Sequence, residues 1–464
     1  MSSPKLFPLP NSHAPMAIDI LIVGAGLSGL ASAFALQRAG HRVTVVERRD
    51  ISLGWTGGGG CRLPPNLVKI LRRWGMSEQL AQRALPLDVL HMLRFETGES
   101  LGEHVWAEEM LREAEGDYEL IHYHDLWDIF HEAVLDAGIK VHSGVEVASI
   151  DLEKRIATLA DGSILSADLF IGADGTRGIT RKLLSDGIEK TPVNGCTMYE
   201  ATVPSESIRN VPELSSLGLG PKDPNKIMLF LGEGHCMHFF PIRGRKEFAI
   251  QLCIAYNENE TEPNGTWGDA ASVSLLDVLP RVVEPRIRKL AEYARLATRI
   301  RSENTKLSTW VHESQRLLVI GESAHPFPPG AQQGSALAVE DAAVLGKLFT
   351  YLVKEEQIGN FLWAIEELRQ GRCDKCLQEE YELYRFLTFP PGPEQIVRDE
   401  DMREKYLSGR KDLRVGDDVA AKQWEELRTV YAYDCEDEAD NWWIEWGLLR
   451  ERARERNEFY TNDA

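Results

Sequence analysis

Runs of apolar residues in the first fifty positions predict a strand, a helix and a second strand. The continuous apolar run from Ile18 to Val23 is typical of a buried strand. Apolar residues at helical spacing follow from Leu30 to Ala39, and Gly40 marks the helix end. A second apolar run, Val43 to Val46, predicts the next strand. The chain therefore opens with a strand-helix-strand unit.

The turn between the first strand and the helix is rich in glycine and reads Gly24-x-Gly26-x-x-Gly29. Gly24 permits a tight turn, Gly26 lets the backbone approach a pyrophosphate at the helix N-terminus, and Gly29 brings helix and strand close together. Glu47 ends the second strand, at the separation where an acidic side chain hydrogen-bonds an adenosine ribose. This context predicts a dinucleotide site rather than a plain glycine-rich turn. The motif alone does not distinguish FAD from NAD.

The alternation of strands and helices continues to about residue 190. A four-glycine run, 57–60, suggests backbone packed near the nucleotide, with a flexible surface loop as the alternative. Leu165 to Ile171 predicts a strand that runs into Gly172-Ala173-Asp174-Gly175, which places Asp174 at the carboxyl edge of a sheet. Further helices are expected at Pro64–Trp74 and Asp125–Ala137, and strands at Leu87–Phe95, Glu119–His122, Lys140–His142, Val145–Leu152 and Arg155–Leu159.

The pattern changes between Cys196 and Ile300 to longer β-like runs. These runs predict an antiparallel sheet inserted into the nucleotide fold, a natural layer for binding a substrate; they are Cys196–Val203, Ile227–Leu231, His235–Ile242 and Phe248–Ala255. Helical segments follow within Ser274–Leu296.

The nucleotide fold then returns with a strand at Leu317–Ile320, the stretch 321–334 and a helix from Ser335 to Lys354. Beyond it, Phe361 to Ala464 reads as mostly charged helix, and the aromatic cluster of Trp442, Trp443 and Trp446 is interpreted as packing residues.

Composition and charge narrow the class of protein. The 464 residues are enough for two domains or more, and the formal charge of -20 disfavours a polyphosphate partner such as nucleic acid. No apolar run approaches the ~20 residues of a membrane span, and the N-terminal stretch has neither a basic region nor an apolar core, so we expect a soluble, cytoplasmic protein without a transmembrane segment. Seven cysteines without regular spacing are expected to be reduced thiols. The Cys373-x-x-Cys376 pair is interpreted as two unrelated cysteines, and no metal is expected.

Three motifs in this order, GxGxxG, GADG and the segment from Gly321-Glu322 through His325 and Gln333-Gly334 to Glu340-Asp341, resemble the class A FAD-dependent monooxygenases. The likeness is greatest to the salicylate hydroxylase-like branch of fungal secondary metabolism. It covers most of residues 16 to 400 and includes Pro64-Pro65-Asn66.

The resemblance implies an α/β fold: a Rossmann-type FAD-binding domain of the glutathione-reductase and para-hydroxybenzoate-hydroxylase type, an inserted antiparallel β-sheet substrate domain and a helical C-terminal region. The corresponding boundaries are a flexible tail at 1–15, the FAD-binding domain at 16–190 and 301–360, the substrate sheet at 191–300 and the C-terminal region at 361–464.

The resemblance also implies one non-covalent FAD and NADPH or NADH as a transient co-substrate. In such enzymes the reduced flavin forms a C4a-hydroperoxide with O2 and oxygenates an electron-rich ring, so a small aromatic or indole-type substrate is expected and the protein must supply a dry pocket. The implied cofactor-binding residues are Gly24, Gly26, Gly29, Glu47, Arg48, Gly60, Arg62, Tyr123, Asp174, Gly175, Glu322, Pro329, Gly330, Gln333 and Gly334. The substrate-side candidates are Tyr199, Glu200, His235, His238, Phe240 and Arg243, with Glu200, Tyr199, His238 and Arg243 as the catalytic set. We expect a monomer or a homodimer.

The sequence departs from the family at informative positions. Glu322 stands where the family has Asp, and Tyr123 stands near where relatives carry an Arg that reaches the FAD. Arg62 occurs in a neighbouring loop and is a candidate replacement, with a solvated surface Arg as the alternative. Glu200 stands where many fungal relatives carry an Arg that points at the substrate.

A carboxylate at position 200 favours a substrate that is neutral or carries a protonated nitrogen, if that side chain faces the pocket. The alternative is a surface ion pair of Glu200 with a neighbouring cation. An alternative function is a redox-silent flavoprotein relative that catalyses a cyclisation or rearrangement by acid/base chemistry.

Overall fold

A five-stranded parallel sheet forms the centre of the nucleotide-type half of the chain. The computed structural model describes residues 13–53, 58–184, 188–190, 196–255, 272–294, 296–301, 305–408 and 428–449. The strands lie in the order β21-β12-β1-β2-β8 and all pair in parallel. They are β1 (Asp19–Val23), β2 (Arg42–Glu47), β8 (Lys140–Ser143), β12 (Leu169–Gly172) and β21 (Leu317–Val319). The predicted strand-helix-strand unit is confirmed at its centre.

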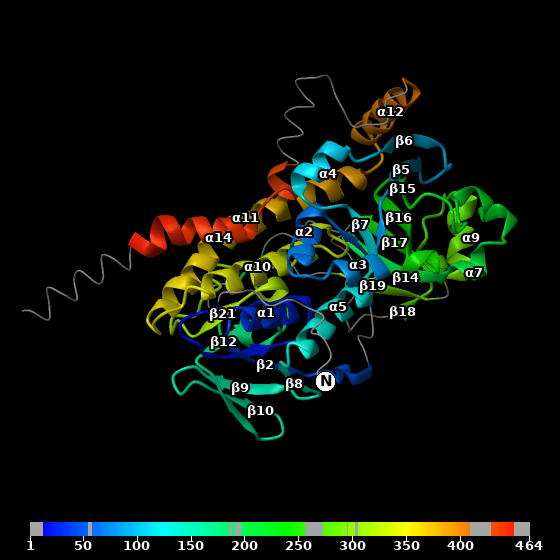
Figure 1. Ribbon diagram of the computed structural model, residues 1–464. Helices are drawn as coiled ribbons and strands as arrows, with labels where there is room; N and C mark the ends of the chain where they lie inside the picture. The colour runs from blue at the N-terminus through cyan, green and yellow to red at the C-terminus, as the bar shows by residue number, and fades with distance from the viewer. Residues whose placement is uncertain are drawn as a thin grey trace, which may run out of the picture.

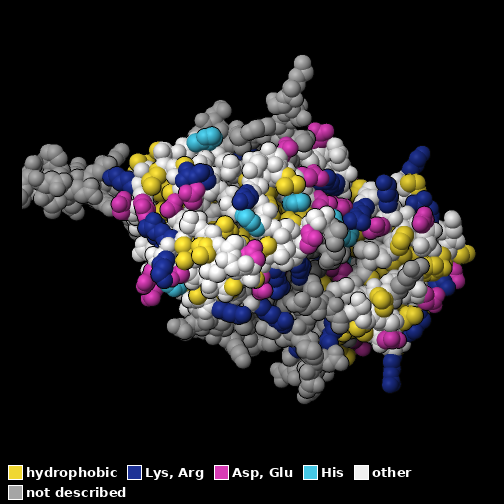
Figure 2. Space-filling view, turned by 90° about the horizontal axis from the view of Figure 1, so that it is seen from below, with side chains coloured by type: hydrophobic (Ala, Val, Ile, Leu, Met, Phe, Trp, Pro, Cys, Tyr) yellow, Lys and Arg dark blue, Asp and Glu magenta, His cyan; other side chains and the backbone are white. Residues whose placement is uncertain are grey.

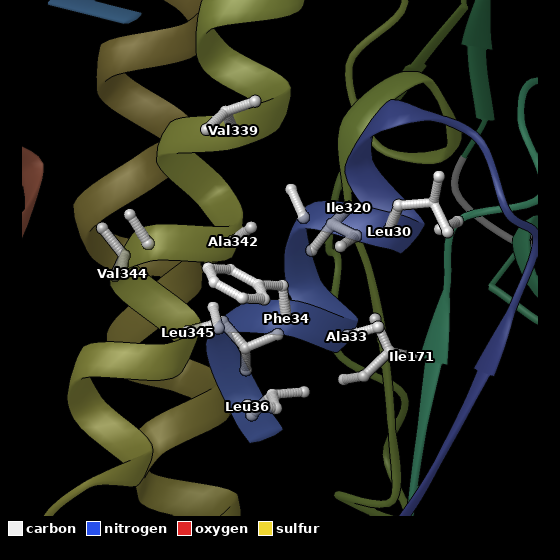
Figure 3. Close-up of a cluster of buried hydrophobic side chains, with 14 of the residues drawn as sticks. Leu30, Ala33, Phe34, Leu36, Ile171, Ile320, Val339, Ala342, Val344 and Leu345 are labelled. Atoms are coloured by element: carbon white, nitrogen blue, oxygen red, sulfur yellow. The ribbon is translucent and has the colours of Figure 1, made fainter. Parts of the chain in front are cut away.

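Helices cover one face of this sheet and a small antiparallel sheet covers the other (Figure 1). The helical side holds α1 (Leu27–Arg38), α5 (Tyr123–Asp136) and α10 (Gln333–Phe349). Phe34 of α1 packs between Ala342 and Leu345 of α10 and Ile171 and Ile320 of the sheet side (Figure 3). The opposite face is covered by β9 (Val147–Asp151), β10 (Ile156–Leu159) and β11 (Ile164–Ser166), with a separate buried apolar cluster beneath them. Continuous apolar strands are expected for a parallel sheet that is buried on both faces.

A second, eight-stranded sheet lies beside the first. Its order is β18-β19-β14-β17-β16-β15-β5-β6. The strands are β5 (Val89–Arg94), β6 (Ser100–His104), β14 (Cys196–Pro204), β15 (Lys226–Leu231), β16 (His235–Ile242), β17 (Glu247–Ala255), β18 (Ser272–Val273) and β19 (Ala297–Ile300). One face packs against α7 (Ser205–Ile208), η3 (Pro212–Leu217), α8 (Leu275–Val278) and α9 (Pro285–Tyr293). The helical segments predicted within Ser274–Leu296 are α8 and α9, with residues 279–284 between them.

This sheet corrects two expectations. It is not purely antiparallel, because β15 pairs in parallel with β5. It is also not built from residues 191–300 alone, because β5 and β6 come from the first part of the chain and cover the edge of β15 that would otherwise present unpaired backbone groups. The domain boundaries at 190, 300 and 360 stay predictions.

Shorter elements join the two sheets. A three-stranded sheet, β3-β7-β4, consists of β3 (Gly60–Leu63), β4 (Leu85–Pro86) and β7 (Glu119–His122), and lies with α2 (Pro65–Arg73), α3 (Ser77–Arg83) and α4 (Glu108–Ala114). The remaining elements are η1 (Ile51–Leu53), α6 (Ile179–Lys182), the pair β13 (Ile188–Lys190) and β20 (Thr305–Leu307), η4 (Arg243–Arg245) and η5 (Gly321–Ser323). Of the four-glycine run, Gly57 lies outside the described residues.

The C-terminal part of the chain is helical. The helices α11 (Gln357–Leu387) and α14 (Cys435–Trp442) pack on α10, α12 (Pro393–Leu407) packs on β6, and the π-helical turn η6 (Trp443–Gly447) follows α14. The predicted packing role fits Trp442, which is buried, and Trp443, which stacks on Tyr351, whereas Trp446 is exposed. Of the predicted N-terminal tail, residues 1–12 lie outside the described residues, and the Ala14 N–H donates to the carbonyl of Ala39.

Buried charges tie α10 to α11. Arg369 lies 2.8 Å from both the Glu340 and the Asp341 carboxylates, and Asp341 also contacts His325 at 2.6 Å. These side chains are almost fully buried, so each charge depends on its partners.

No helix in the described ranges is both long and apolar enough to cross a membrane. Acidic and basic side chains are interspersed over the face in Figure 2, so the net charge does not form a single acidic patch there.

Candidate functional site

A long cavity of about 580 Å³ runs from the carboxyl edge of the parallel sheet to the eight-stranded sheet. Its first end lies among Val46 to Arg49 and Val145 to Ala148. Its middle passes the glycine turn and the loop after β12. The other end, called the sheet end below, is lined by Gly60, Cys61, Arg62, Gln251 and Gly330. This is the edge where open α/β sheets bind ligands.

The three glycines of the turn differ in what a side chain would meet. A Cβ at Gly24, which has a φ of +104°, would lie 2.3 Å from the Ala173 carbonyl oxygen, and one at Gly29 would lie 2.0 Å from the carbonyl oxygen of Gly24. A Cβ at Gly26 would meet nothing within 4 Å. Two glycines are therefore required by the protein's own packing, whereas Gly26 faces the open cavity at the N-terminus of α1, where backbone N–H groups favour an anion.

Glu47 holds the glycine turn. Its buried carboxylate accepts the Ala25 N–H through Oε2 at 2.7 Å and the Arg49 N–H through Oε1 at 2.8 Å. Because each oxygen has a second lone pair, a contact to a ribose hydroxyl is compatible with these bonds and stays a prediction. Arg48 is exposed beside it and lines the same end of the cavity.

The loop after β12 is fixed by its own side chains. Asp174 accepts the Thr180 N–H at 3.1 Å and the Thr180 hydroxyl, and the Gly175 N–H donates to Ser323 Oγ at 2.7 Å. Burial raises the pKa of Asp174, against these hydrogen bonds. Both Asp174 and Gly175 line the cavity, and their contact with a cofactor stays a prediction.

Glu322 and Tyr123 line the middle of the cavity. Burial raises the pKa of the Glu322 carboxyl and of the Tyr123 phenol. Tyr123 also fills the space above Gly58, where a Cβ would lie 3.0 Å from the Tyr123 Cβ. A neutral aromatic ring thus borders the middle of the cavity at position 123.

Polar side chains from β3, β14, β16 and β17 converge at the sheet end. Arg62 Nη1 lies 3.1 Å from His238 Nε2, and Nη2 donates to the Gly330 carbonyl. Gln251 Nε2 donates to the Gly60 carbonyl at 2.7 Å and to Glu200 Oε1 at 2.9 Å. Burial and the charge of Arg62 lower the pKa of His238, so a neutral imidazole accepts from Arg62.

Glu200 lies on the cavity side of its strand but behind the first layer of residues. A Cβ at Gly59 would touch the Glu200 carboxylate, and Gln251, not Glu200, lines the cavity. Burial raises the pKa of Glu200 to about 7, although the Gln251 amide favours the ionised form. The surface ion pair considered for this residue is excluded because its side chain is 4% exposed.

Two of the four predicted catalytic residues are placed elsewhere. Tyr199 follows the alternation of the strand and packs in the apolar cluster on the other face of the sheet. Arg243 follows β16, as the first residue of η4, and pairs with Asp125 and Glu247, each at 3.2 Å. Neither lines the cavity. Of the other substrate-side candidates, His235 packs edge-on against Phe95, whereas Phe240 lies under Gly60.

Some of the remaining predicted cofactor residues line the cavity and others do not. Gly60, Arg62, Gly330 and Gly334 line the cavity, but Pro329 and Gln333 do not. The Pro329 carbonyl accepts the Tyr384 hydroxyl at 2.8 Å, and Gln333 Oε1 accepts from Asn66 at 3.0 Å.

Sequence reasoning missed Gln251. The signal was present, because Gln251 is the one amide in the otherwise apolar run Phe248–Ala255, and it falls on the same face of the sheet as Glu200 and His238, its neighbours in the register.

A buried group near the cavity has the composition of a metal site. Ligand atoms of His325, Asp341 and Cys373 lie within 4.8 Å of one another. However, Asp341 already accepts from Gly321, His325 and Arg369, and the guanidinium of Arg369 opposes a second cation. The group is therefore better described as part of the charge network between α10 and α11.

Comparisons with known proteins agree with this geometry. The family described as FAD binding domain matches residues 17–379. "FAD-dependent monooxygenase OpS4" of Beauveria bassiana is 26% identical, with 83% of this chain and 89% of that protein covered. "Hispidin-3-hydroxylase" of Neonothopanus nambi is 27% identical, over 89% of this chain and 97% of that protein. The crystal structure of CtdE in complex with FAD and substrate 4 superposes with a TM-score of 0.74 at 21% identity, covering 94% of this chain and 100% of that one, and confirms the fold.

The cavity fits an FAD on three observations. It is long, it leaves Gly26 uncovered at a helix N-terminus, and Arg48, Arg177 and Lys182 line it with positive charge. We therefore expect Gly26→Val to yield folded protein that does not retain FAD. The added Cβ meets no protein atom within 4 Å, and the side chain would stand where the pyrophosphate is expected to approach the backbone. The measurement is the flavin-to-protein ratio after purification, together with the melting temperature of the flavin-free protein.

The matched control is Gly371→Val, since a Cβ at Gly371 also meets nothing within 4 Å but lies on α11, away from the lining. Retention of a full complement of FAD by Gly26→Val would contradict the placement of the cofactor.

The raised pKa of Glu200 predicts a pH-dependent stability. The folded protein keeps a proton that the unfolded chain releases between pH 4.5 and about 7, so the contribution of this carboxyl to stability decreases as pH rises across that window. We expect Glu200→Gln to be more stable than wild type at pH 8, by on the order of 2 kcal/mol, with the difference disappearing toward pH 4.5.

Urea unfolding at several pH values measures this difference. The control is Glu394→Gln, which removes an exposed surface carboxylate. A pH-independent effect of Glu200→Gln would show that Glu200 is ionised throughout.

Proposed function

This chain belongs to the FAD binding domain family and is an FAD-dependent oxidoreductase, and we propose that it acts as a monooxygenase that uses NAD(P)H and O2 to hydroxylate or epoxidise an aromatic or indole-type small molecule. The observation that carries the proposal is the shape of the cavity. It starts at a glycine turn suited to a pyrophosphate and ends against a separate sheet that supplies buried polar side chains.

We propose that the first two-thirds of the cavity holds the cofactor. The backbone of Gly24 and Gly26, with Gly29 keeping helix and strand close, faces the pyrophosphate, and Glu47 with Arg48 faces the adenosine. Asp174, Gly175, Tyr123 and Glu322 border the middle of the cofactor, and Gly330 and Gly334 border its flavin. When bound, FAD supplies the hydride acceptor and the oxygen-activating chemistry.

The role of the chain at the sheet end is to exclude water. Gly330 packs against Met198 and Tyr384, since a Cβ there would lie 2.8 Å from Met198 Sδ and 3.1 Å from the Tyr384 hydroxyl. Met198 and Tyr384 belong to a buried apolar cluster that extends across β14, β15 and β16. A dry sheet end is what oxygen transfer requires, because water competes for the activated oxygen.

Gln251 is the residue best placed to orient a substrate. Its amide nitrogen is fixed by Gly60 and Glu200, and its Oε1 is buried without a hydrogen-bond partner among the described residues. A buried acceptor of this kind is stabilised by a donor, and a substrate hydroxyl or indole N–H supplies one. Glu200 positions Gln251 by accepting a hydrogen bond from the Gln251 amide nitrogen at 2.9 Å, and burial raises the pKa of the Glu200 carboxyl to about 7.

The test is turnover with isotopic oxygen. Purified protein reconstituted with FAD is expected to oxidise NADPH or NADH slowly alone and faster with one or more members of a panel of phenols and indoles. Under ¹⁸O2 the product should gain one labelled oxygen atom, measured by mass spectrometry.

The redox-silent alternative makes the opposite prediction. If FAD-loaded protein converts a substrate without O2 uptake and without label, the oxygenase proposal is wrong and an acid/base cyclase or isomerase replaces it.

A further inference from the structure

Arg62 places a cation at the sheet end of the cavity. It lies on β3, lines the sheet end and is 7% exposed. Its two known hydrogen bonds, to His238 and to the Gly330 carbonyl, use two of the five N–H groups of a guanidinium. Both acceptors are neutral, because the pKa of His238 is lowered by burial and by Arg62 itself.

The charge of Arg62 has no matching carboxylate. In the part of the chain that the structure describes, no Asp or Glu oxygen lies within 4.0 Å of it. Burial acts to lower the pKa of Arg62. The surrounding Tyr118, Tyr384 and Glu380 act in the opposite direction and by more, so the pKa is raised and Arg62 stays protonated. A charge that is removed from water in this way is costly unless an opposite charge or several hydrogen bonds compensate it.

The nearby carboxyls of Glu200 and Glu380 compensate the charge of Arg62 only in part. Burial raises the pKa of Glu200 and of Glu380 to about 7, even though Arg62 acts in the opposite direction on both. Burial therefore disfavours the ionised form of both carboxyls. Glu380 is in addition engaged with the Gln333 N–H at 2.8 Å, and Glu200 with Gln251.

We infer that Arg62 recognises an anionic oxygen of the substrate, so that the pocket selects molecules that bind as a phenolate, an enolate or a carboxylate. That the bound anion is the substrate rests on the proposed function. Binding of an anion at Arg62 can be measured without turnover. The guanidinium supplies charge-assisted hydrogen bonds to the anion, and the anion supplies the counter-charge that the described protein lacks.

This inference differs from the expectation that Glu200 selects a neutral or protonated-amine substrate. Glu200 lies behind Gly59 and Gln251 and does not line the cavity, whereas Arg62 does. The side chain that sets the charge preference therefore comes from β3 and not from β14.

The test compares two ligands of the same shape and different charge. Benzoate and benzamide are titrated into the purified protein at pH 7.5 by calorimetry, with FAD bound and without it. Wild type is expected to bind benzoate about tenfold or more tightly than benzamide, which corresponds to about 1.4 kcal/mol. Arg62→Met should lose this preference, and Arg62→Lys, which keeps the charge, should retain part of it.

The matched control is Arg243→Met, which removes the arginine directly after β16 that pairs with Asp125 and Glu247 outside the cavity. It should leave the preference unchanged. Wild type that binds benzamide as well as benzoate, wild type that does not bind benzoate, or an Arg62→Met variant that keeps the preference would overturn the inference. Because binding is measured without NAD(P)H or O2, failure here is distinct from failure of the monooxygenase proposal.

Discussion

The whole structure depends on keeping a long cavity open inside a closely packed protein. Interiors normally lack voids larger than a water molecule, because each missing contact costs dispersion energy. Here about 580 Å³ stays open between the two sheets. Close backbone approaches at Gly24 and Gly29 fix one wall, Tyr123 and Glu322 border the middle, and the contacts of Gly330 with Met198 and Tyr384 fix the opposite end. The charge network around Arg369 and Asp341 anchors the loop that carries His325 to the long C-terminal helices.

Much of this arrangement was predictable because it depends on local patterns. The unit of β1, α1 and β2 follows from continuous apolar runs and three glycines whose spacing is fixed by backbone geometry, and strands such as His235–Ile242 have the predicted bounds. The pairing of β15 with β5 was not predictable, because the two strands are more than a hundred residues apart and no local feature of either specifies the partner. For the same reason the predicted substrate layer lacked β5 and β6.

The site shows where strand reasoning succeeds and where it stops. Alternation correctly separates Tyr199 from Glu200, and it puts Glu200, Gln251 and His238 on one face. Alternation does not predict which element covers that face of the sheet. Only the structure shows that β3 crosses this face of the sheet. Glu200 is therefore separated from the cavity, whereas Arg62 of β3 lines the cavity. The pairing of Arg243 with Asp125, 118 residues away in sequence, could not be predicted, because it leaves no trace in the local sequence pattern.

The central claim is that one ligand spans the cavity from the glycine turn to the sheet end, and its most direct measurement is the thermal stability of flavin-free protein with FAD, FMN and ADP at equal concentrations. A ligand that binds only the folded state raises the melting temperature in proportion to the logarithm of its concentration over its dissociation constant. Because FMN lacks the adenosine half and ADP lacks the flavin half, FAD should raise the melting temperature clearly more than either. A shift with ADP as large as that with FAD, or no shift with FAD, would contradict the account.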